Sequence, residues 1–272
     1  MNTVMLREKA QLMRKLIVEG IAEAGSGHPG GSLSLAEIMS YLYFHQAQLH
    51  EKDPLWPARD RIILSKGHAA PVLYAALAAR GYMPYEEMLT LRKLGTRLQG
   101  HPDMRKLPGV EMSTGSLGQG LSVANGLALG LRLQNEPSRV YVVLGDGELQ
   151  EGQVWEAAMT AAHYNLTNLI AVVDHNGLQI DGFTGEVKRI EPLAEKWQAF
   201  GWQTVTVDGH SFVDLYRGFN VVRDDRPLVV IAKTVKGKGV PYMENVADWH
   251  GKAPSKVQAQ EYIGGLGGDV RG

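Results

Sequence analysis

Cysteine is missing from this 272-residue chain, which excludes disulfides, metal sites built from thiolates and a cysteine nucleophile. Charge of one sign is not in excess either, because 28 lysines and arginines are balanced by 29 aspartates and glutamates, and the two signs are interspersed. A surface for nucleic acid or an acidic membrane is therefore not expected. Small molecules are the expected partners.

Long apolar runs are also missing. No stretch approaches the roughly eighteen apolar residues of a membrane-spanning helix, and residues 1–20 carry charges such as Arg7 and Arg14, so they form neither a signal peptide nor an anchor. We expect a soluble, cytoplasmic protein. With 44% hydrophobic residues and no long linker or repeat, residues 1–272 are expected to form a single domain.

The most informative stretch lies in the middle of the chain. Residues 139–144 have the pattern of a buried strand, residues 150–164 that of an amphipathic helix, and residues 168–173 that of a second buried strand. Together they predict a βαβ unit. Asp146 and Asn176 then follow neighbouring parallel strands at one edge of a sheet, which is where open α/β sheets bind ligands.

A carboxylate and an amide at such an edge suit a divalent metal that carries phosphate. Mg²⁺ prefers hard oxygen ligands and takes few of them from protein when phosphate supplies the rest. Backbone N–H groups of the turn Gly145-Asp146-Gly147 would receive the phosphate. Because Gly-Asp-Gly is a common turn and Asn-Gly a common hairpin signal, the inference depends on their position after adjacent strands.

Strand and helix patterns alternate along the rest of the chain. Strands are predicted at 61–65, 204–207 and 227–232, and helices at 4–24, 34–44, 84–94, 191–200 and 212–222 and in the alanine-rich stretch after residue 68. The alternation predicts an α/β fold with a mostly parallel sheet covered by helices on both faces. The glycine-rich tail is expected to cover part of the surface.

Two glycine-rich segments could bind a cofactor. Residues 25–30 match the dinucleotide-binding fingerprint, but that motif must follow a strand and here it follows a predicted helix, so we discard the Rossmann interpretation. Residues 114–120 run straight into a helix rich in small residues. From composition alone, this loop is equally a packing turn or a cofactor cradle. The nucleotide-binding motif Gly-x-x-x-x-Gly-Lys-[Ser/Thr] does not occur.

Six motifs occur in the order typical of the transketolase family, which the chain resembles over about residues 5–254. They are Ser26-Gly-His-Pro-Gly30, Leu64-Ser-Lys-Gly-His68, Gly100-His-Pro102, Thr114-Gly-Ser-Leu-Gly-Gln-Gly120, Gly145-Asp-Gly147 and Trp249-His-Gly-Lys-Ala-Pro254. The separation of thirty positions between Asp146 and Asn176 also resembles the family's thiamine diphosphate signature. The resemblance implies the thiamine diphosphate-binding fold, in the amino-terminal, diphosphate-binding half of a transketolase.

The resemblance also implies roles for individual residues. Asp146 and Asn176 would bind Mg²⁺, or Ca²⁺ or Mn²⁺ in its place, through their side chains, and Leu178 would bind it through its main-chain carbonyl. Glu151 and Glu156 would lie at the subunit interface and link paired active sites. The residues expected to contact thiamine diphosphate are His68, Gly115, Leu117, Gly145, Asp146, Gly147, Glu151, Asn176 and His250. The residues expected to line the sugar channel and act in catalysis are His28, His101 and His250.

Each implied role has a simpler alternative. A histidine beside glycine in a loop is most often a solvated turn residue, although four of them at glycine-bounded junctions suit proton transfer near neutral pH. Glu151 and Glu156 would stabilise the start of a helix through its dipole without any interface.

The chain departs from the family pattern at three positions: His175 replaces an acid, Asp103 replaces a glutamate and Ser116 replaces a proline. The histidines expected to be structural are His45, His50, His163 and His210.

The implied function is that of a transketolase dependent on thiamine diphosphate and Mg²⁺, which moves a two-carbon ketol unit from a ketose phosphate to an aldose acceptor. The family's pyrimidine-binding half is not found in these residues, so a separate pyrimidine-binding subunit is expected, in an α2β2 assembly. Two alternatives are the first subunit of a thiamine enzyme that decarboxylates a 2-oxo acid, and a non-catalytic module that binds phosphate or a nucleotide. The histidine set favours transketolase over the first, and the missing nucleotide motif weakens the second.

Overall fold

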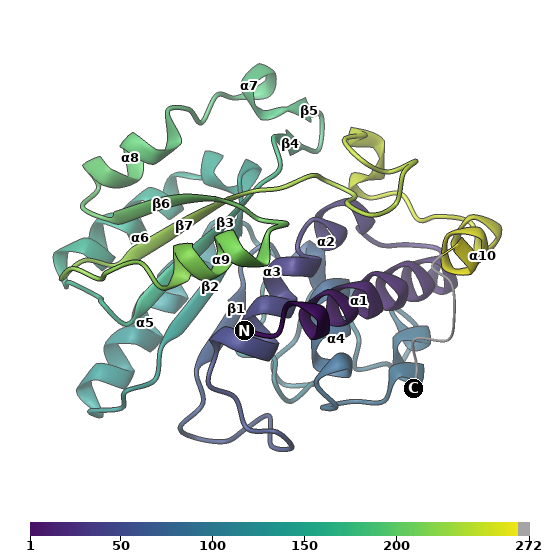
Figure 1. The fold of residues 1–272 in the computed structure, drawn as a ribbon, viewed down its shortest axis with the longest axis horizontal. Helices are drawn as coiled ribbons and strands as arrows, with labels where there is room; N and C mark the ends of the chain where they lie inside the picture. Colours follow the sequence, from purple (N-terminus) through teal and green to yellow (C-terminus); the bar gives the residue numbers. More distant parts are fainter. Residues whose placement is uncertain (266–272) are drawn as a thin grey trace.

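Five parallel strands form the central sheet of the computed structural model, which describes residues 1–265 (Figure 1). Their order across the sheet is β1-β2-β3-β7-β6, and every neighbouring pair is parallel. The strands are β1 (Arg61–Leu64), β2 (Val140–Gly145), β3 (Leu169–His175), β6 (Gln203–Asp208) and β7 (Leu228–Lys233). The predicted βαβ unit is confirmed, because β2 and β3 are parallel neighbours.

Alternate side chains of the strands enter two apolar cores, one on each face of the sheet. In β2, Tyr141 and Val143 join the first core, whereas Val142 and Leu144 join the second. The first core is covered by α1 (Thr3–Ala24), α3 (Ala36–Tyr41), α4 (Ala70–Ala79) and α9 (Phe212–Phe219), and the second by α5 (Gln119–Leu133), α6 (Gly152–His163) and α8 (Leu193–Ala199). This arrangement confirms the predicted parallel sheet covered on both faces.

Shorter elements connect this framework. They are α2 (Pro29–Leu33), η1 (Leu42–Gln46), η2 (Gly67–Ala69), η3 (Tyr85–Thr90), η4 (Gly147–Gln150), β4 (Leu178–Gln179), β5 (Gly182–Phe183), α7 (Thr184–Val187), η5 (Ala247–His250) and α10 (Lys256–Gly265). Strands β4 and β5 pair as a small antiparallel hairpin. No helix within residues 1–265 is long and apolar enough to cross a membrane. The tail expected at the surface falls on residues 266–272, outside the described part.

Two predicted helices differ from the observed structure. The helix predicted at 34–44 is divided between α3 and the π-helical turn η1. The helix predicted at 84–94 is only the 3₁₀ helix η3, which ends where Leu91 turns to an extended ψ of 127°. The next residue, Arg92, has a positive φ of 60°, and its N–H donates to the carbonyl of Leu98. A residue in the left-handed region cannot continue a right-handed helix.

Helix α1 delivers the chain to the first glycine-rich segment. It begins after Asn2, whose side chain accepts from the N–H of Met5 at 3.1 Å, and it ends at Gly25 with φ of 63°. Glycine suits this left-handed cap because it has no Cβ to clash. Residues 25–30 therefore follow a helix, which confirms the rejection of the dinucleotide-binding interpretation.

Candidate functional site

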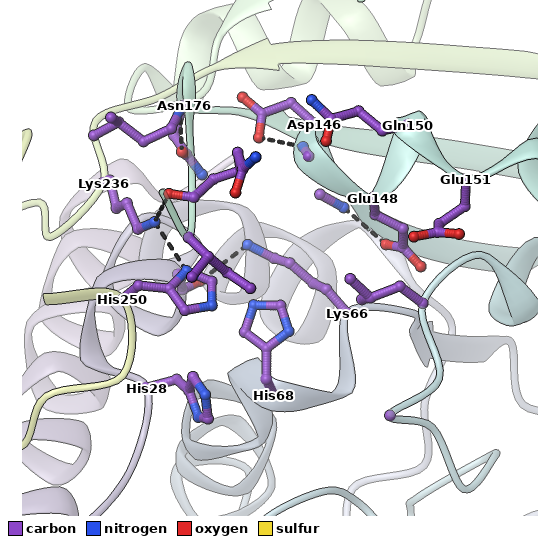
Figure 2. Close-up of a pocket in the computed structure, with 18 residues that line it drawn as sticks. His28, Lys66, His68, Asp146, Glu148, Gln150, Glu151, Asn176, Lys236 and His250 are labelled. Carbon is purple, nitrogen blue, oxygen red and sulfur yellow. Dashed lines mark hydrogen bonds between the residues drawn. The ribbon is translucent and has the colours of Figure 1, made fainter. Parts of the chain in front are cut away.

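A cavity of about 300 Å³ opens at the carboxyl edge of the sheet, where the segments after β1, β2, β3 and β7 meet (Figure 2). Both its size and its place at this edge are typical of small-molecule sites in α/β proteins. The predicted site residues that line it are His28, His68, Gly115, Leu117, Gly145, Asp146, Gly147, Glu151, Asn176, Leu178 and His250. The fold thus brings together residues from five of the six sequence motifs and from the segment after β3.

His101 and Glu156 lie outside this lining. The exposed His101 ring lies 6.4 Å from the ring of His28, measured between centroids, and a Cβ on Gly115 would come within 3.1 Å of its imidazole. His101 is therefore next to the cavity, on the side of His28. Glu156 is exposed on α6, and Glu151 is exposed just before this helix. Their predicted role at an interface stays a prediction.

Three imidazoles gather at one end of the cavity (Figure 2). The ring centroids of His28, His68 and His250 are 5.0 to 5.5 Å apart. Burial first, and then the nearby cations Arg92, Lys66 and Lys236, lower the pKa of His28 to about 4, that of His68 to about 2 and that of His250 to about 3. Near neutral pH these rings are uncharged, so each can both donate and accept a hydrogen bond.

Asp146 and Asn176 lie at the other end of the cavity (Figure 2). The Asp146 carboxylate accepts from the N–H groups of Gly147 at 2.8 Å and Gly177 at 2.5 Å. Burial, and then the nearby Asp174 carboxylate, raise the pKa of Asp146 to about 6. A divalent cation would offset both effects, and the carboxylate and amide oxygens are ligands that Mg²⁺ accepts.

The donor set fits a metal that is held partly by phosphate. Among residues 1–265, no group of three or more His, Cys, Asp or Glu side chains is placed to hold a metal ion alone, so further ligands must come from amide, main-chain or cofactor oxygens. The turn packs closely against β4, because a Cβ on Gly147 would meet the Cβ of Gln179 at 2.8 Å. Only glycine fits there.

Three charged residues of the cavity wall had no role in the sequence interpretation. Lys66 is 2% exposed, and its ammonium forms an ion pair with Asp174 and donates to the carbonyl of Gly31 at 3.1 Å. Lys236, also 2% exposed, donates to Nδ1 of His250 at 3.0 Å. The third is Glu148, 2% exposed.

The positions of these three residues in the sequence could have identified them as site residues. Lys66, Glu148 and Lys236 each follow a buried strand within a few residues, at the same carboxyl edge that identified Asp146. Burial, and then the charge of the neighbouring Lys66, lower the pKa of Lys236 to about 8. Two buried ammonium groups next to a cavity can neutralise a polyanionic ligand such as a diphosphate.

Comparison with known proteins identifies the relatives of this arrangement. The family model of the transketolase thiamine diphosphate binding domain matches residues 6–267. The chain is 46% identical to a 6-deoxy-6-sulfo-D-fructose transketolase subunit of Clostridium sp. strain MSTE9, with 88% of each chain covered. It is 39% identical to an apulose-4-phosphate transketolase subunit of Phocaeicola vulgatus, covering 97% of this chain and 94% of that protein. These matches confirm the resemblance inferred from the six motifs.

Complete transketolases are longer than this chain. Human transketolase is 42% identical over 259 residues, which are 95% of this chain and 41% of the human protein. The structure of Campylobacter jejuni transketolase superposes with a TM-score of 0.92 at 32% identity, covering all of this chain and 44% of that one. The chain thus spans about two fifths of these enzymes, whereas it spans most of the two bacterial subunits.

Proposed function

This chain belongs to the transketolase family, and we propose that it is the diphosphate-binding subunit of a cytoplasmic, two-chain transketolase dependent on thiamine diphosphate and Mg²⁺. The enzyme moves a two-carbon ketol unit from a ketose phosphate to an aldose acceptor. The observation that carries the proposal is the cavity at the carboxyl edge, which combines metal-binding oxygens with buried lysines and a cluster of neutral histidines.

In this proposal the protein holds the cofactor by its charged end. Asp146 and Asn176, with the main-chain carbonyl of Leu178, hold Mg²⁺, Ca²⁺ or Mn²⁺, and the N–H of Gly147 donates to the diphosphate. The ammonium groups of Lys66 and Lys236 lie in the same wall and neutralise part of its charge. Bound thiamine diphosphate supplies a nucleophilic carbon and a sink for the electrons of the broken carbon–carbon bond.

The histidines act on the sugar and on the cofactor. His28, His101 and His250 bind substrate hydroxyls and move protons, for which rings that are neutral near pH 7 are suited. Lys236 donates to Nδ1 of His250, so the proton of the neutral His250 ring is on Nε2, which is left to donate. His68, next to Lys66, contacts the diphosphate. Gly115 and Leu117 flank the aminopyrimidine.

The proposed partner is a separate chain that contributes the pyrimidine-binding half, in an α2β2 assembly. Support comes from the two bacterial relatives named as transketolase subunits, of whose lengths this chain covers 88% and 94%. Glu151 and Glu156 are both exposed in the isolated chain, as residues of a subunit interface must be before assembly.

Ketol transfer from a ketose phosphate to an aldose acceptor tests the proposal. The purified chain, free of host transketolase, should be inactive alone and gain activity when a pyrimidine-binding partner chain, sought in a neighbouring reading frame, is added. The partner chain by itself is the control. Robust turnover by the diphosphate-binding chain alone would contradict the two-chain enzyme, and turnover only with a 2-oxo acid would indicate the decarboxylase alternative.

Binding measurements separate the proposal from a nucleotide-binding module. Calorimetric titration in the presence of Mg²⁺ should show binding of thiamine diphosphate and none of ATP or NAD. The reverse preference would refute the proposed cofactor.

A further inference from the structure

The carboxylate of Glu148 connects three segments that meet at the cavity. Its Oε1 accepts from the hydroxyl of Ser65, at the end of β1, and from the N–H of Gly118 at 3.0 Å, in the loop before α5. Its Oε2 accepts from the N–H of Gly145 at 3.0 Å, at the end of β2. The side chain is 2% exposed, and none of the roles proposed above uses it.

The loop that Glu148 holds is also restricted by close packing. Gly118 has φ of 85°, and a Cβ on it would meet the Cβ of Glu151 at 2.9 Å. Gly120 packs as closely, since a Cβ there would come within 2.3 Å of the Ser65 hydroxyl oxygen. Residues 115–118 therefore occupy a narrow space, and the hydrogen bond to Glu148 fixes the backbone within it.

We propose that Glu148 is a positioning residue that holds loop 115–118 at a fixed distance from the turn Gly145-Asp146-Gly147. Gly115 and Leu117 line the cavity from the loop, and Asp146 and Gly147 line it from the turn. A carboxylate suits this task because both oxygens accept, whereas an amide offers only one accepting atom. The inference rests on the proposed function, in which loop and turn contact opposite ends of thiamine diphosphate.

Hydrogen exchange of the free chain, without any cofactor, tests whether Glu148 restrains loop 115–118. In Glu148→Gln, the amide NH₂ group faces one of the backbone donors and leaves the N–H of Gly118 or Gly145 unpaired. Peptides that cover 115–120 and 145–148 should therefore exchange faster than in the wild type. Unchanged protection in both peptides would overturn the proposal.

Asp60→Asn is the matched control. Asp60 is also a buried carboxylate, 5% exposed, and accepts from the N–H groups of Gln48 at 2.8 Å and Arg139 at 2.7 Å. It lies at the amino edge of the sheet, just before β1. This variant should increase exchange near 48 and 139 and leave the loop protected. Faster exchange of loop 115–118 in Asp60→Asn as well would indicate general destabilisation and count against a specific role of Glu148.

Calorimetry with thiamine diphosphate and Mg²⁺ then tests whether the hydrogen bonds of Glu148 to loop 115–118 position the cofactor. Glu148→Gln should bind about tenfold more weakly or worse, as expected when a buried hydrogen bond is lost, while Asp60→Asn should match the wild type. A loosened loop with wild-type affinity would overturn the positioning role. If the wild-type chain bound no thiamine diphosphate either alone or with the partner chain, that would contradict the proposed function, and the exchange result would still decide whether Glu148 holds the loop.

Gly118→Ala keeps the proposal testable if Glu148→Gln does not fold. A φ of 85° is unfavourable for alanine, and the alanine Cβ would meet Glu151, so this change displaces the same loop without altering Glu148. It should weaken thiamine diphosphate binding by a similar factor, with an unchanged circular dichroism spectrum. Wild-type affinity in Gly118→Ala would show that the loop position does not matter to the cofactor.

Discussion

Glu37 and Asp146 are both carboxylates in the interior of the same molecule, but their surroundings differ. Both oxygens of Glu37 accept from Arg14, at 2.6 and 2.7 Å, and one of them also contacts Nδ1 of His210 at 2.8 Å. The hydrogen bonds of Asp146 come from the backbone N–H groups of Gly147 and Gly177. One carboxylate is neutralised by side chains of the fold, and the other is not.

The pKa values show the same contrast. Although burial alone would raise it, the hydrogen bond from His210 and the charge of Arg14 hold the pKa of Glu37 below its usual value. The pKa of Asp146 is raised to about 6 by burial and by Asp174. The Glu37 cluster, which ties α1 to α3 and to the loop after β6, therefore contributes stability. Asp146 accepts from backbone N–H groups, so its charge is left to attract a cationic ligand.

Replacing Asp146 should have the largest effect on the cavity. We expect Asp146→Ala to abolish retention of thiamine diphosphate, because the metal loses its anionic protein ligand and the charge of the diphosphate is poorly neutralised. Removing divalent ions with a chelator should release the cofactor from the wild type in the same way. Calorimetry measures both. Unchanged affinity in a folded Asp146→Ala variant would refute the metal assignment.

Replacing a substrate-side histidine should reduce the rate without affecting the cofactor. In the reconstituted enzyme, His28→Ala and His101→Ala should lower kcat/KM by about 10²–10⁴, as is typical when a positioned proton-transfer group is lost. Their affinity for thiamine diphosphate should stay near that of the wild type. The control is His210→Ala, which changes the Glu37 cluster and should leave kcat/KM unchanged. A histidine variant that lost cofactor but turned over normally at saturating cofactor would invalidate this division of roles.

Replacing Glu37 should produce the opposite result to Asp146→Ala. In Glu37→Gln, the Arg14 guanidinium stays buried without a counter-charge, so the free energy of unfolding should fall by about 3 kcal/mol. Denaturant unfolding monitored by circular dichroism measures this loss. Thiamine diphosphate affinity below the unfolding transition should not change. Loss of cofactor from the folded variant would mean that the two clusters are coupled.

The same contrast explains what the sequence could predict. Strands β2, β3 and β7 are nearly continuous apolar runs, and Asp146 and Asn176 directly follow two of them, so local pattern was sufficient to place both at one edge. Lys66 was not assigned a role although its motif was noted, because its burial depends on pairing with Asp174, 108 residues away. Sequence spacing shows neither burial nor such distant partners.

The Glu37 cluster was not recognised, and the helix at 84–94 was predicted too long, for the same reason. His210 lies 173 residues from Glu37, and no local pattern joins them. A helix was expected at residues 84–94, but the N–H of Arg92 donates back to the carbonyl of Leu98, which only the tertiary structure reveals. Specific packing overrides local propensity at such positions.

The cavity histidine His28 and the Glu37 cluster should affect the free energy of unfolding in different pH ranges. The pKa of His28 is lowered from 6.5 to about 4, mainly by burial and then by Arg92, so between these values the unfolded chain binds more protons than the folded one. Stability therefore falls as pH drops below 6.5. The pKa of Glu37 is lowered from 4.5, so its contribution is present above pH 4.5 and is lost as pH falls through its folded pKa.

Two variants make this separation measurable. His28→Ala should flatten the decline of unfolding free energy between pH 6.5 and 4.5, by at most about 1.4 kcal/mol per pH unit for the one proton removed. Glu37→Gln should keep the wild-type slope in that range and flatten it only below pH 4.5. Urea unfolding at steps of pH gives both slopes. If the unfolding free energy of His28→Ala declines as steeply as that of the wild type above pH 4.5, the cavity does not hold the imidazole neutral. The pH dependence of stability would then not distinguish the cavity from the Glu37 cluster.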